Sequence, residues 1–414
     1  MMSGLYIHIP FCSSKCAYCG FYSIPSLKRK ADFLEALKQE IAARKGELHG
    51  EKVGTVYFGG GTPSLLKEEE LETILKILHD HFEIDPEAEV TLEANPDTLS
   101  LDYLVSLRKL GVNRLSIGIQ SFFDEDLKYL SRRHDAQHAQ DCLLWARAAG
   151  FDNVTIDLIY GLPTSDADQW SRNLDLFFAT GFPHLSAYAL TLEPNAILTK
   201  QIEMGKVLPV NEDDAVRDYE ILCQKMAQHG FQHYEISNFC KPGMHSRHNT
   251  SYWFGVPYAG FGPSAHSYDG VSRQWNVASL EEYVESGTPK GSPTEREVKR
   301  KTENGERRTE NIAEGRPFCN TTRQCGEGTW KCDGVEYLTP EQRYDEYVML
   351  RLRTMWGVDL SAMKQSLGER FSTYCEKNAQ PLIEQGRLSR KGAVLYLTDQ
   401  QMLFVDGIAE ALFW

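Results

Sequence analysis

The chain has 414 residues, 42% of them hydrophobic, which is enough material for one large domain and one smaller domain. Its formal net charge of −14 argues against general nucleic-acid binding, because such binding depends on attraction to phosphates. The sequence has no long apolar run and no charged-then-apolar leader, so we expect no transmembrane segment and no secretion. The ten cysteines are spread thinly over the chain, which fits a reducing, cytoplasmic location better than a disulfide framework.

Three cysteines, Cys12, Cys16 and Cys19, follow the first predicted strand, residues 5–9, at C-x3-C-x2-C spacing. Three thiolates so close together can hold a [4Fe–4S] cluster, and three protein ligands leave one of the four irons open to a small molecule. The alternatives are a zinc site or incidental thiols, but a structural zinc site normally takes four ligands and no second pair follows. The loop therefore predicts a cluster with one open iron.

Strand-like and helical patterns alternate along the next 180 residues or so. Apolar strand-like runs occur at 5–9, 55–58, 90–93, 114–120, 153–159 and 184–192. Patterns with apolar residues at three- and four-residue steps separate them, at 31–44, 68–82, 101–110, 136–149 and 166–179. Alternation of this kind is typical of parallel βα units. It predicts an α/β fold, either an incomplete TIM-like (β/α)6 barrel or an open doubly wound sheet.

Polar or glycine-rich residues stand at the end of each predicted strand. The sequence GGGTP occupies 59–63, and Glu93, Gln120, Asp157 and Tyr188 lie at or near the ends of later strands. Alone, a glycine triplet is often only a loop and a strand-end acid only a cap. Because the carboxyl ends of parallel strands meet on one rim, their recurrence favours the barrel and predicts a single site there.

Several of these motifs together resemble the radical SAM superfamily, specifically its coproporphyrinogen-oxidase-like branch, over most of 5–268. They are the cysteine loop, GGGTP, LEANP, GIQSF with the following LSRRH, and DLIYGLP. The resemblance implies that S-adenosylmethionine chelates the open iron, and that an electron from the cluster cleaves it to a 5′-deoxyadenosyl radical. It implies these residue roles: cluster ligands Cys12, Cys16 and Cys19; aromatic neighbours Tyr6 and Tyr18; a loop under the methionine end formed by Gly60, Gly61 and Thr62; and polar contacts from Glu93, Gln120, Arg132 and Asp157.

Within that branch the chain differs from the oxygen-independent coproporphyrinogen oxidases. Phe21 stands where those enzymes carry a fourth cysteine, and they carry a longer segment before the cluster strand. The sequence HNTSYW, 248–253, resembles the H-N-x-x-Y-W motif of the related heme chaperones (HemW type). The resemblance implies that His248 binds heme, and imidazole is a common heme ligand, although a histidine beside a tryptophan is more often a packing residue. His245 and His266 are further heme-side candidates, with an ordinary structural role as the alternative.

These observations predict a heme chaperone that binds a [4Fe–4S] cluster, S-adenosylmethionine and heme, and transfers heme to respiratory or other heme-dependent proteins. Acceptor heme proteins as partners, homodimer formation and peripheral membrane contact are implied by the resemblance alone. The alternative is a coproporphyrinogen III oxidase, a radical SAM oxidative decarboxylase. A nucleic-acid-binding regulator is a third hypothesis, which the acidity of the chain disfavours.

The composition predicts three parts: a radical SAM barrel over 1–285, a charged insertion over 286–337 and a C-terminal domain over 338–414. The insertion has almost nothing apolar between 295 and 316, so we expect it to be disordered. Cys319, Cys325 and Cys332 near its end match no familiar metal spacing. Predicted helices at 340–354, 362–374, 378–385 and 399–413, with a hairpin at 387–397, suggest a winged-helix-like α+β domain, more suited to packing or docking than to DNA.

Overall fold

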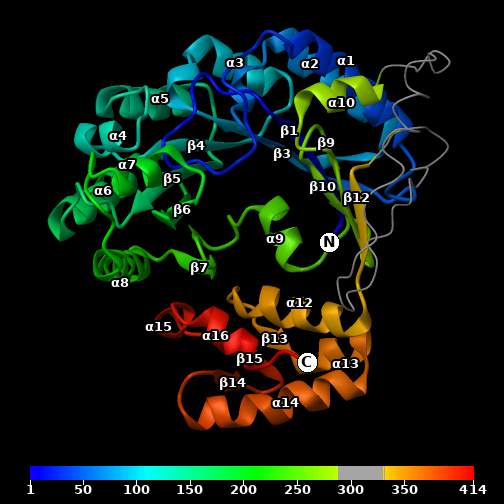
Figure 1. The fold of residues 1–414 in the computed structure, drawn as a ribbon, viewed down its shortest axis with the longest axis vertical. Coiled ribbons are helices and arrows are strands. Elements are labelled where there is room, and N and C mark those ends of the chain that lie inside the picture. The colour runs from blue at the N-terminus through cyan, green and yellow to red at the C-terminus, as the bar shows by residue number, and fades with distance from the viewer. Residues whose placement is uncertain (288–329, 331) are drawn as a thin grey trace, which may run out of the picture.

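The computed structural model describes residues 1–287, 330 and 332–414. It has a large α/β domain built on one sheet and a smaller helical domain below it in Figure 1. The strands of the described sheet are β1 (Ser3–Ile9), β2 (Val53–Gly60), β3 (Ile84–Ala94), β4 (Arg114–Gln120), β5 (Val154–Tyr160), β6 (His184–Ala189), β7 (Gln232–Glu235), β8 (Asn238–Cys240), β9 (Tyr258–Phe261), β10 (His266–Tyr268), β11 (Ser272–Trp275) and β12 (Gly334–Tyr337).

Strands β1 to β6 lie in chain order and pair in parallel, so the strand order does not reverse within this part of the sheet. A doubly wound sheet requires such a reversal. The predicted incomplete (β/α)6 barrel is therefore confirmed, and the open doubly wound alternative is wrong. Strand β9 extends the parallel part beside β1, while β8 and β7 add an antiparallel edge beyond β6.

The predicted helices cover the outer face of this sheet (Figure 1). They are α1 (Lys30–Ala43), α2 (Glu68–His81), α3 (Leu101–Lys109), α5 (Ala136–Ala148) and α6 (Ala167–Thr180). The sequence did not predict α4 (Asp124–Tyr129), which lies between β4 and α5 in the chain. Later helices are α7 (Ile197–Glu203), α8 (Glu212–Gln228), α9 (Arg247–Trp253) and α10 (Leu280–Gly287). The apolar faces of α1, α2, α3, α5, α6, α8 and α10 form one continuous core with the strands, in which Leu5, Phe58, Leu115 and Trp170 are essentially inaccessible to solvent.

The C-terminal domain has a hydrophobic core of its own, running from Tyr344 to Leu412. Its elements are α12 (Pro340–Leu352), β13 (Val358–Asp359), α13 (Leu360–Leu367), α14 (Glu369–Glu384), β14 (Ser389–Lys391), β15 (Val394–Tyr396), α15 (Asp399–Met402) and α16 (Val405–Glu410). Helices followed by the β14–β15 hairpin give the winged-helix-like arrangement that the sequence predicts. The domain meets the barrel through the backbone, where Met355 N donates to Tyr234 O at 3.0 Å.

Two of the predicted helix boundaries in this domain are wrong. The sequence pattern predicts helices at 362–374 and 378–385, whereas α13 ends before Gly368 and α14 then continues through Pro381. Gly368 has φ of +105°, which few other residues adopt, so the chain breaks there. The predicted final helix is likewise divided into α15 and α16.

The predicted insertion lies largely outside the described residues, and so do Cys319 and Cys325. Its last residues are described and form β12, which pairs antiparallel with β11. Cys332 lies just before this strand. No helix among the described residues is long and apolar enough to cross a bilayer.

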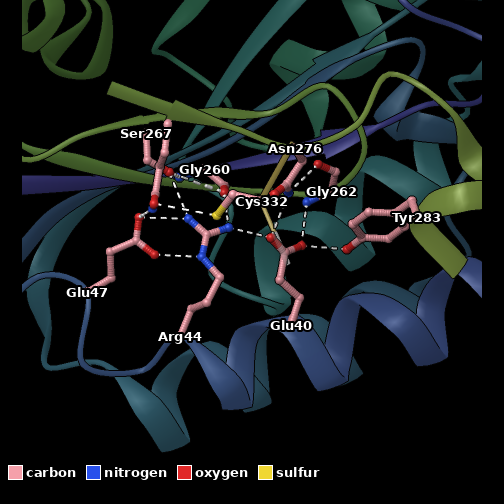
Figure 2. A network of polar contacts seen from close by, with 10 residues as sticks. Glu40, Arg44, Glu47, Gly260, Gly262, Ser267, Asn276, Tyr283 and Cys332 are labelled. Atoms are coloured by element: carbon pink, nitrogen blue, oxygen red, sulfur yellow. Dashed lines mark hydrogen bonds and ion pairs between the residues drawn. The ribbon is translucent and has the colours of Figure 1, made fainter. Parts of the chain in front are cut away.

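A buried polar network joins α1 to the end of the sheet (Figure 2). Arg44 and Glu40, 1% and 0% exposed, form an ion pair one helical turn apart. The Arg44 guanidinium also binds Glu47 at 2.6 Å and donates to Gly260 O at 2.8 Å. Glu40 accepts from Gly262 N at 2.8 Å and from the Tyr283 hydroxyl at 2.5 Å. These bonds fasten β9 and α10 to the first helix of the barrel.

Replacing Arg44 with Met should destabilise the protein by about 3–5 kcal/mol, because it leaves the buried Glu40 and the partly buried Glu47 without their cation. The double variant Glu40→Gln/Arg44→Met should recover part of this loss, because position 40 is then neutral and no longer buries an unpaired carboxylate. Lys38→Met, which breaks the exposed pair with Glu35, should cost at most about 1 kcal/mol. Urea unfolding followed by circular dichroism measures all three, and equal losses for Arg44→Met and Lys38→Met would contradict the prediction.

Candidate functional site

The loop after β1 is held by backbone hydrogen bonds across its two ends. Cys12 N donates to Ile24 O at 3.1 Å, and Ile24 N donates to Pro10 O at 2.7 Å. Further along, Leu198 N donates to Ala17 O at 2.8 Å, which ties the middle of the loop to α7. The loop is therefore an anchored structure at the carboxyl end of the barrel.

A cavity of about 600 Å³ opens over this end of the strands. Most of the residues that the sequence singles out line it: Cys12, Cys16, Tyr18, Cys19, Gly60, Gly61, Thr62, Glu93, Gln120, Arg132 and Asp157. They come from the loops or ends of β1, β2, β3, β4 and β5, as expected for parallel strands that end on one rim. The predicted convergence of these strand ends is confirmed.

The three cysteines are free thiols that are partly exposed, and all three border the cavity. The Arg132 guanidinium donates to Cys16 Sγ at 3.3 Å, and the Thr62 hydroxyl donates to Cys12 Sγ at 3.6 Å. Burial raises the pKa of the Cys19 thiol. Three soft sulfur donors beside a fixed cation are the donor set that an iron–sulfur cluster uses, so these residues fit that group.

Two glycines let the loop after β2 pass close under the cysteine loop. A side chain at Gly60, which has φ of +110°, would meet the His8 ring at 2.7 Å. One at Gly61 would lie 2.5 Å from Phe11 O. Larger residues at either position would push the two loops apart and displace Cys12 from the cavity.

Several hydrogen bonds fix the position of the Arg132 side chain beside the cavity. Its guanidinium donates to Asn95 Oδ1 at 2.8 Å and to Gly118 O at 2.7 Å, in addition to Cys16. Gln120 lies beside it with a left-handed backbone, φ of +67°, at an irregularity in the β4–β5 pairing. Non-glycine residues held in this conformation often belong to functional sites, because the surrounding fold must compensate the strain.

Two buried carboxyl groups face the same cavity. Glu93 accepts hydrogen bonds from the Tyr57 hydroxyl at 2.8 Å and from Gly60 N at 3.2 Å. Asp157 accepts from the Ser116 hydroxyl at 3.1 Å. Burial raises the pKa of Glu93 to about 7 and that of Asp157 to about 6. Both groups therefore change charge near neutral pH and can accept hydrogen bonds from a polar ligand once ionised.

Tyr6 and His248 are the two predicted site residues that do not line this cavity. His248 lies at the opposite end of the barrel, 1% exposed, with its ring stacked on Tyr57 at 4.9 Å. Its Nδ1 is hydrogen-bonded to the Thr55 hydroxyl and its Nε2 to the Tyr252 hydroxyl, both at 2.8 Å. Burial lowers the pKa of His248 to about 3. The imidazole is therefore neutral and closed to a ligand in this conformation.

Helix α9, which carries the HNTSYW motif, is held in place by one buried acid. Glu89 on β3 accepts from the backbone N–H groups of Arg247 and His248, each at 3.0 Å. A carboxylate at a helix N-terminus satisfies free donors and complements the helix dipole. Beyond its C-terminal end, Phe254 packs edge-on against Trp356 of the C-terminal domain at 5.1 Å, so α9 lies between the two domains (Figure 1).

Ser116 and Gly118 also line the cavity, although the sequence did not identify them as site residues. A side chain at Gly118 would lie 2.7 Å from Gln120 Nε2, so any larger residue there would displace the Gln120 side chain. Both residues stand at two-residue steps before Gln120 and therefore share its face of β4. This two-residue spacing from Gln120 was the feature of the sequence that could have identified them. Strand β4 is buried along its whole length, so its sequence does not show the polar–apolar alternation that would distinguish one face from the other.

Protonation of Glu93 should stabilise the ligand-free protein. Its folded pKa of about 7 exceeds the ordinary 4.5, so its contribution is fully present below about pH 4.5 and is lost as the pH rises through 7. Glu93→Gln should therefore match the wild type at pH 4.5 and become more stable by roughly 1–3 kcal/mol at pH 8. Urea unfolding across this range measures the difference.

The exposed Glu220→Gln on α8 is the control, and its difference from wild type should stay within about 0.5 kcal/mol. A Glu93→Gln effect that does not depend on pH would contradict the assignment.

The comparisons with known proteins agree with this geometry. Residues 6–177 match the model of the radical SAM superfamily, and 338–404 match that of the HemN C-terminal domain. The heme chaperone HemW of Mycobacterium tuberculosis is 33% identical, covering 99% of this chain and 94% of its own. That of Bacillus subtilis is 36% identical, covering 97% of each chain.

Among solved structures, the Escherichia coli coproporphyrinogen III oxidase HemN, a radical SAM enzyme, has a TM-score of 0.75 at 24% identity. It covers 100% of this chain and 90% of that one. This likeness establishes the fold. Radical SAM membership implies a [4Fe–4S] cluster and S-adenosylmethionine as cofactors. Taken with the cysteine-lined cavity and the full-length relatives, it follows that the chain belongs to the HemW family of heme chaperones, within the radical SAM superfamily.

Proposed function

We propose that this protein is a cytoplasmic heme chaperone that carries a [4Fe–4S] cluster on Cys12, Cys16 and Cys19, binds S-adenosylmethionine, and hands heme to heme-dependent proteins, including respiratory ones. The observation that carries the proposal is the convergence of three free thiols on one cavity, in a chain whose full-length relatives are named heme chaperones. Heme is cargo here, and acceptor heme proteins are the partners.

When bound, the cluster and S-adenosylmethionine supply one-electron chemistry at the open iron. The residues around the cavity bind and orient the sulfonium compound. Glu93 and Asp157 suit its ribose hydroxyls and ammonium group, and Arg132 suits its carboxylate. The backbone at Gly60 and Gly61 lies where only small residues allow a close approach. Tyr18 supplies an aromatic wall.

Heme binding through His248 requires a rearrangement of α9. The imidazole must break its bonds to Thr55 and Tyr252 and leave the ring stack before either nitrogen can reach iron. We propose that α9 opens at its contact with the C-terminal domain, where Phe254 meets Trp356. The partly exposed His245 lies just before α9, with its ring centroid 5.8 Å from that of Trp356, and is the alternative heme ligand at this junction.

Anaerobic reconstitution tests the cluster. The wild type should hold about four irons per chain, and Cys19→Ala should lose most of this iron and the associated visible absorbance, because one ligand is gone. Cys142→Ser is the matched control, since Cys142 is buried in α5 and its thiol donates to Ala139 O, a bond that serine can keep. Equal iron in Cys19→Ala and wild type would contradict the assignment.

An anaerobic heme titration of the cluster-loaded protein, followed at the Soret band, tests the cargo site. The wild type should bind one heme per chain, and His248→Gln should weaken binding by about tenfold or more, because glutamine can keep the bonds to Thr55 and Tyr252 but ligates iron poorly. Tyr252→Phe should strengthen binding, since it frees Nε2.

His245→Ala is the matched control in this titration. If His245→Ala weakens binding and His248→Gln does not, heme binds at the domain junction instead. If neither variant matters, or no specific binding appears, the chaperone proposal fails and protoporphyrinogen formation from coproporphyrinogen III becomes the activity to assay.

A further inference from the structure

Three potential metal ligands meet where the barrel contacts the C-terminal domain, far from the cysteine loop in sequence. Cys223 comes from α8, His233 from β7, and Asp399 is the first residue of α15. One ligand atom of each lies within 4.8 Å of the other two. The three elements adjoin one another below the barrel in Figure 1.

The histidine ring is held in one orientation. It stacks on Phe239 at 4.1 Å with an interplanar angle of 11°, and its side chain is only 6% exposed. Nε2 lies 3.3 Å from Ile236 O, and Nδ1 lies 2.8 Å from Asp399 Oδ1. Both of these oxygens are hydrogen-bond acceptors, so the tautomer decides which ring nitrogen donates, and Nδ1 is the nitrogen that faces the carboxylate.

One sulfur, one ring nitrogen and one carboxylate oxygen from these three residues lie within 4.8 Å of one another. In a metal-binding histidine, the ring nitrogen that does not ligate the metal usually donates to a backbone carbonyl or a carboxylate, and the contact of Nε2 with Ile236 O has this form.

The other two ligands are positioned by the same elements. Tyr219, one turn before Cys223 on α8, donates to Asp399 O at 3.0 Å and fixes the start of α15. Cys223 is partly exposed, and burial raises the pKa of its thiol to about 12. A bound cation would displace this proton, as metals do at thiol ligands.

We propose that Cys223, His233 and Asp399 form a three-ligand site for a zinc-type divalent cation, which fastens the C-terminal domain to the barrel. A sulfur, an imidazole and a carboxylate are all accepted by zinc, and water can take the fourth position. The ligand atoms would need to draw together to roughly 3.3–3.8 Å for tetrahedral coordination. The site is independent of the cluster and of the proposed heme transfer.

Zinc binding to the cluster-loaded full chain tests the proposal, because the cluster occupies Cys12, Cys16 and Cys19. After dialysis against a chelator, the protein is titrated with zinc in competition with a chromogenic indicator, and bound zinc is measured by mass spectrometry. The wild type should bind about one zinc per chain, and zinc should raise its melting temperature, as any ligand of the folded state does.

Two variants separate a metal site from an ordinary ion pair. Asp399→Asn can still accept a hydrogen bond from His233 but ligates zinc poorly, and Cys223→Ser removes the thiolate. Each should weaken zinc binding by about tenfold or more and abolish the zinc-dependent shift in melting temperature. Cys142→Ser should leave both unchanged. Absence of stoichiometric zinc in the wild type, or equal zinc affinity in Asp399→Asn, would overturn the proposal and leave a His233–Asp399 ion pair.

Discussion

Parallel pairing of β1 to β6 is the constraint on which the rest of the structure depends. Hydrogen bonds between neighbouring parallel strands fix their direction and register, so their carboxyl ends lie on one rim. This is how Cys12, after β1, comes to share a cavity with Asp157 on β5, nearly 150 residues later. A different strand order would leave the same side chains on separate faces of the molecule.

The two ends of the barrel differ in the charge and the accessibility of their polar side chains. At the carboxyl end, Arg132 and the two carboxyl groups of Glu93 and Asp157 surround an open cavity, where a polar ligand can replace water. At the other end, His248 is neutral and enclosed by aromatic rings and hydroxyl groups. Cofactor chemistry and heme handling would therefore occupy opposite ends of one barrel, with α9 and the C-terminal domain on the heme side.

The junction between the domains is polar as well as aromatic. Backbone pairing at Tyr234 and Met355, the ion pair of Arg273 with Glu346 at 2.8 Å, and the contact of His233 with Asp399 all cross it. Junctions of this kind separate more readily than a continuous apolar core, because water can replace their polar contacts. Such a junction suits a protein in which α9 must move to release its histidine.

Local sequence patterns were sufficient to predict most of the barrel. The apolar strands and the helices between them were identified correctly apart from α4, because each depends on neighbours in the chain. The cysteines and the strand-end residues line one cavity, and their roles there stay predictions. Patterns were less informative where a single residue interrupts or continues an element. Gly368 ends a helix that periodicity would extend, while Pro381 lies within α14 without ending it.

What the sequence by itself determined is the chemistry available: three thiols in one loop, acids and an arginine at strand ends, and a histidine in an aromatic motif. Only the tertiary structure decided which of these groups are accessible. Burial of His248 against Thr55 and Tyr252, and the meeting of Cys223, His233 and Asp399, depend on contacts between segments far apart in the chain. No local pattern encodes such contacts, because they form only when the sheet and the C-terminal domain pack together.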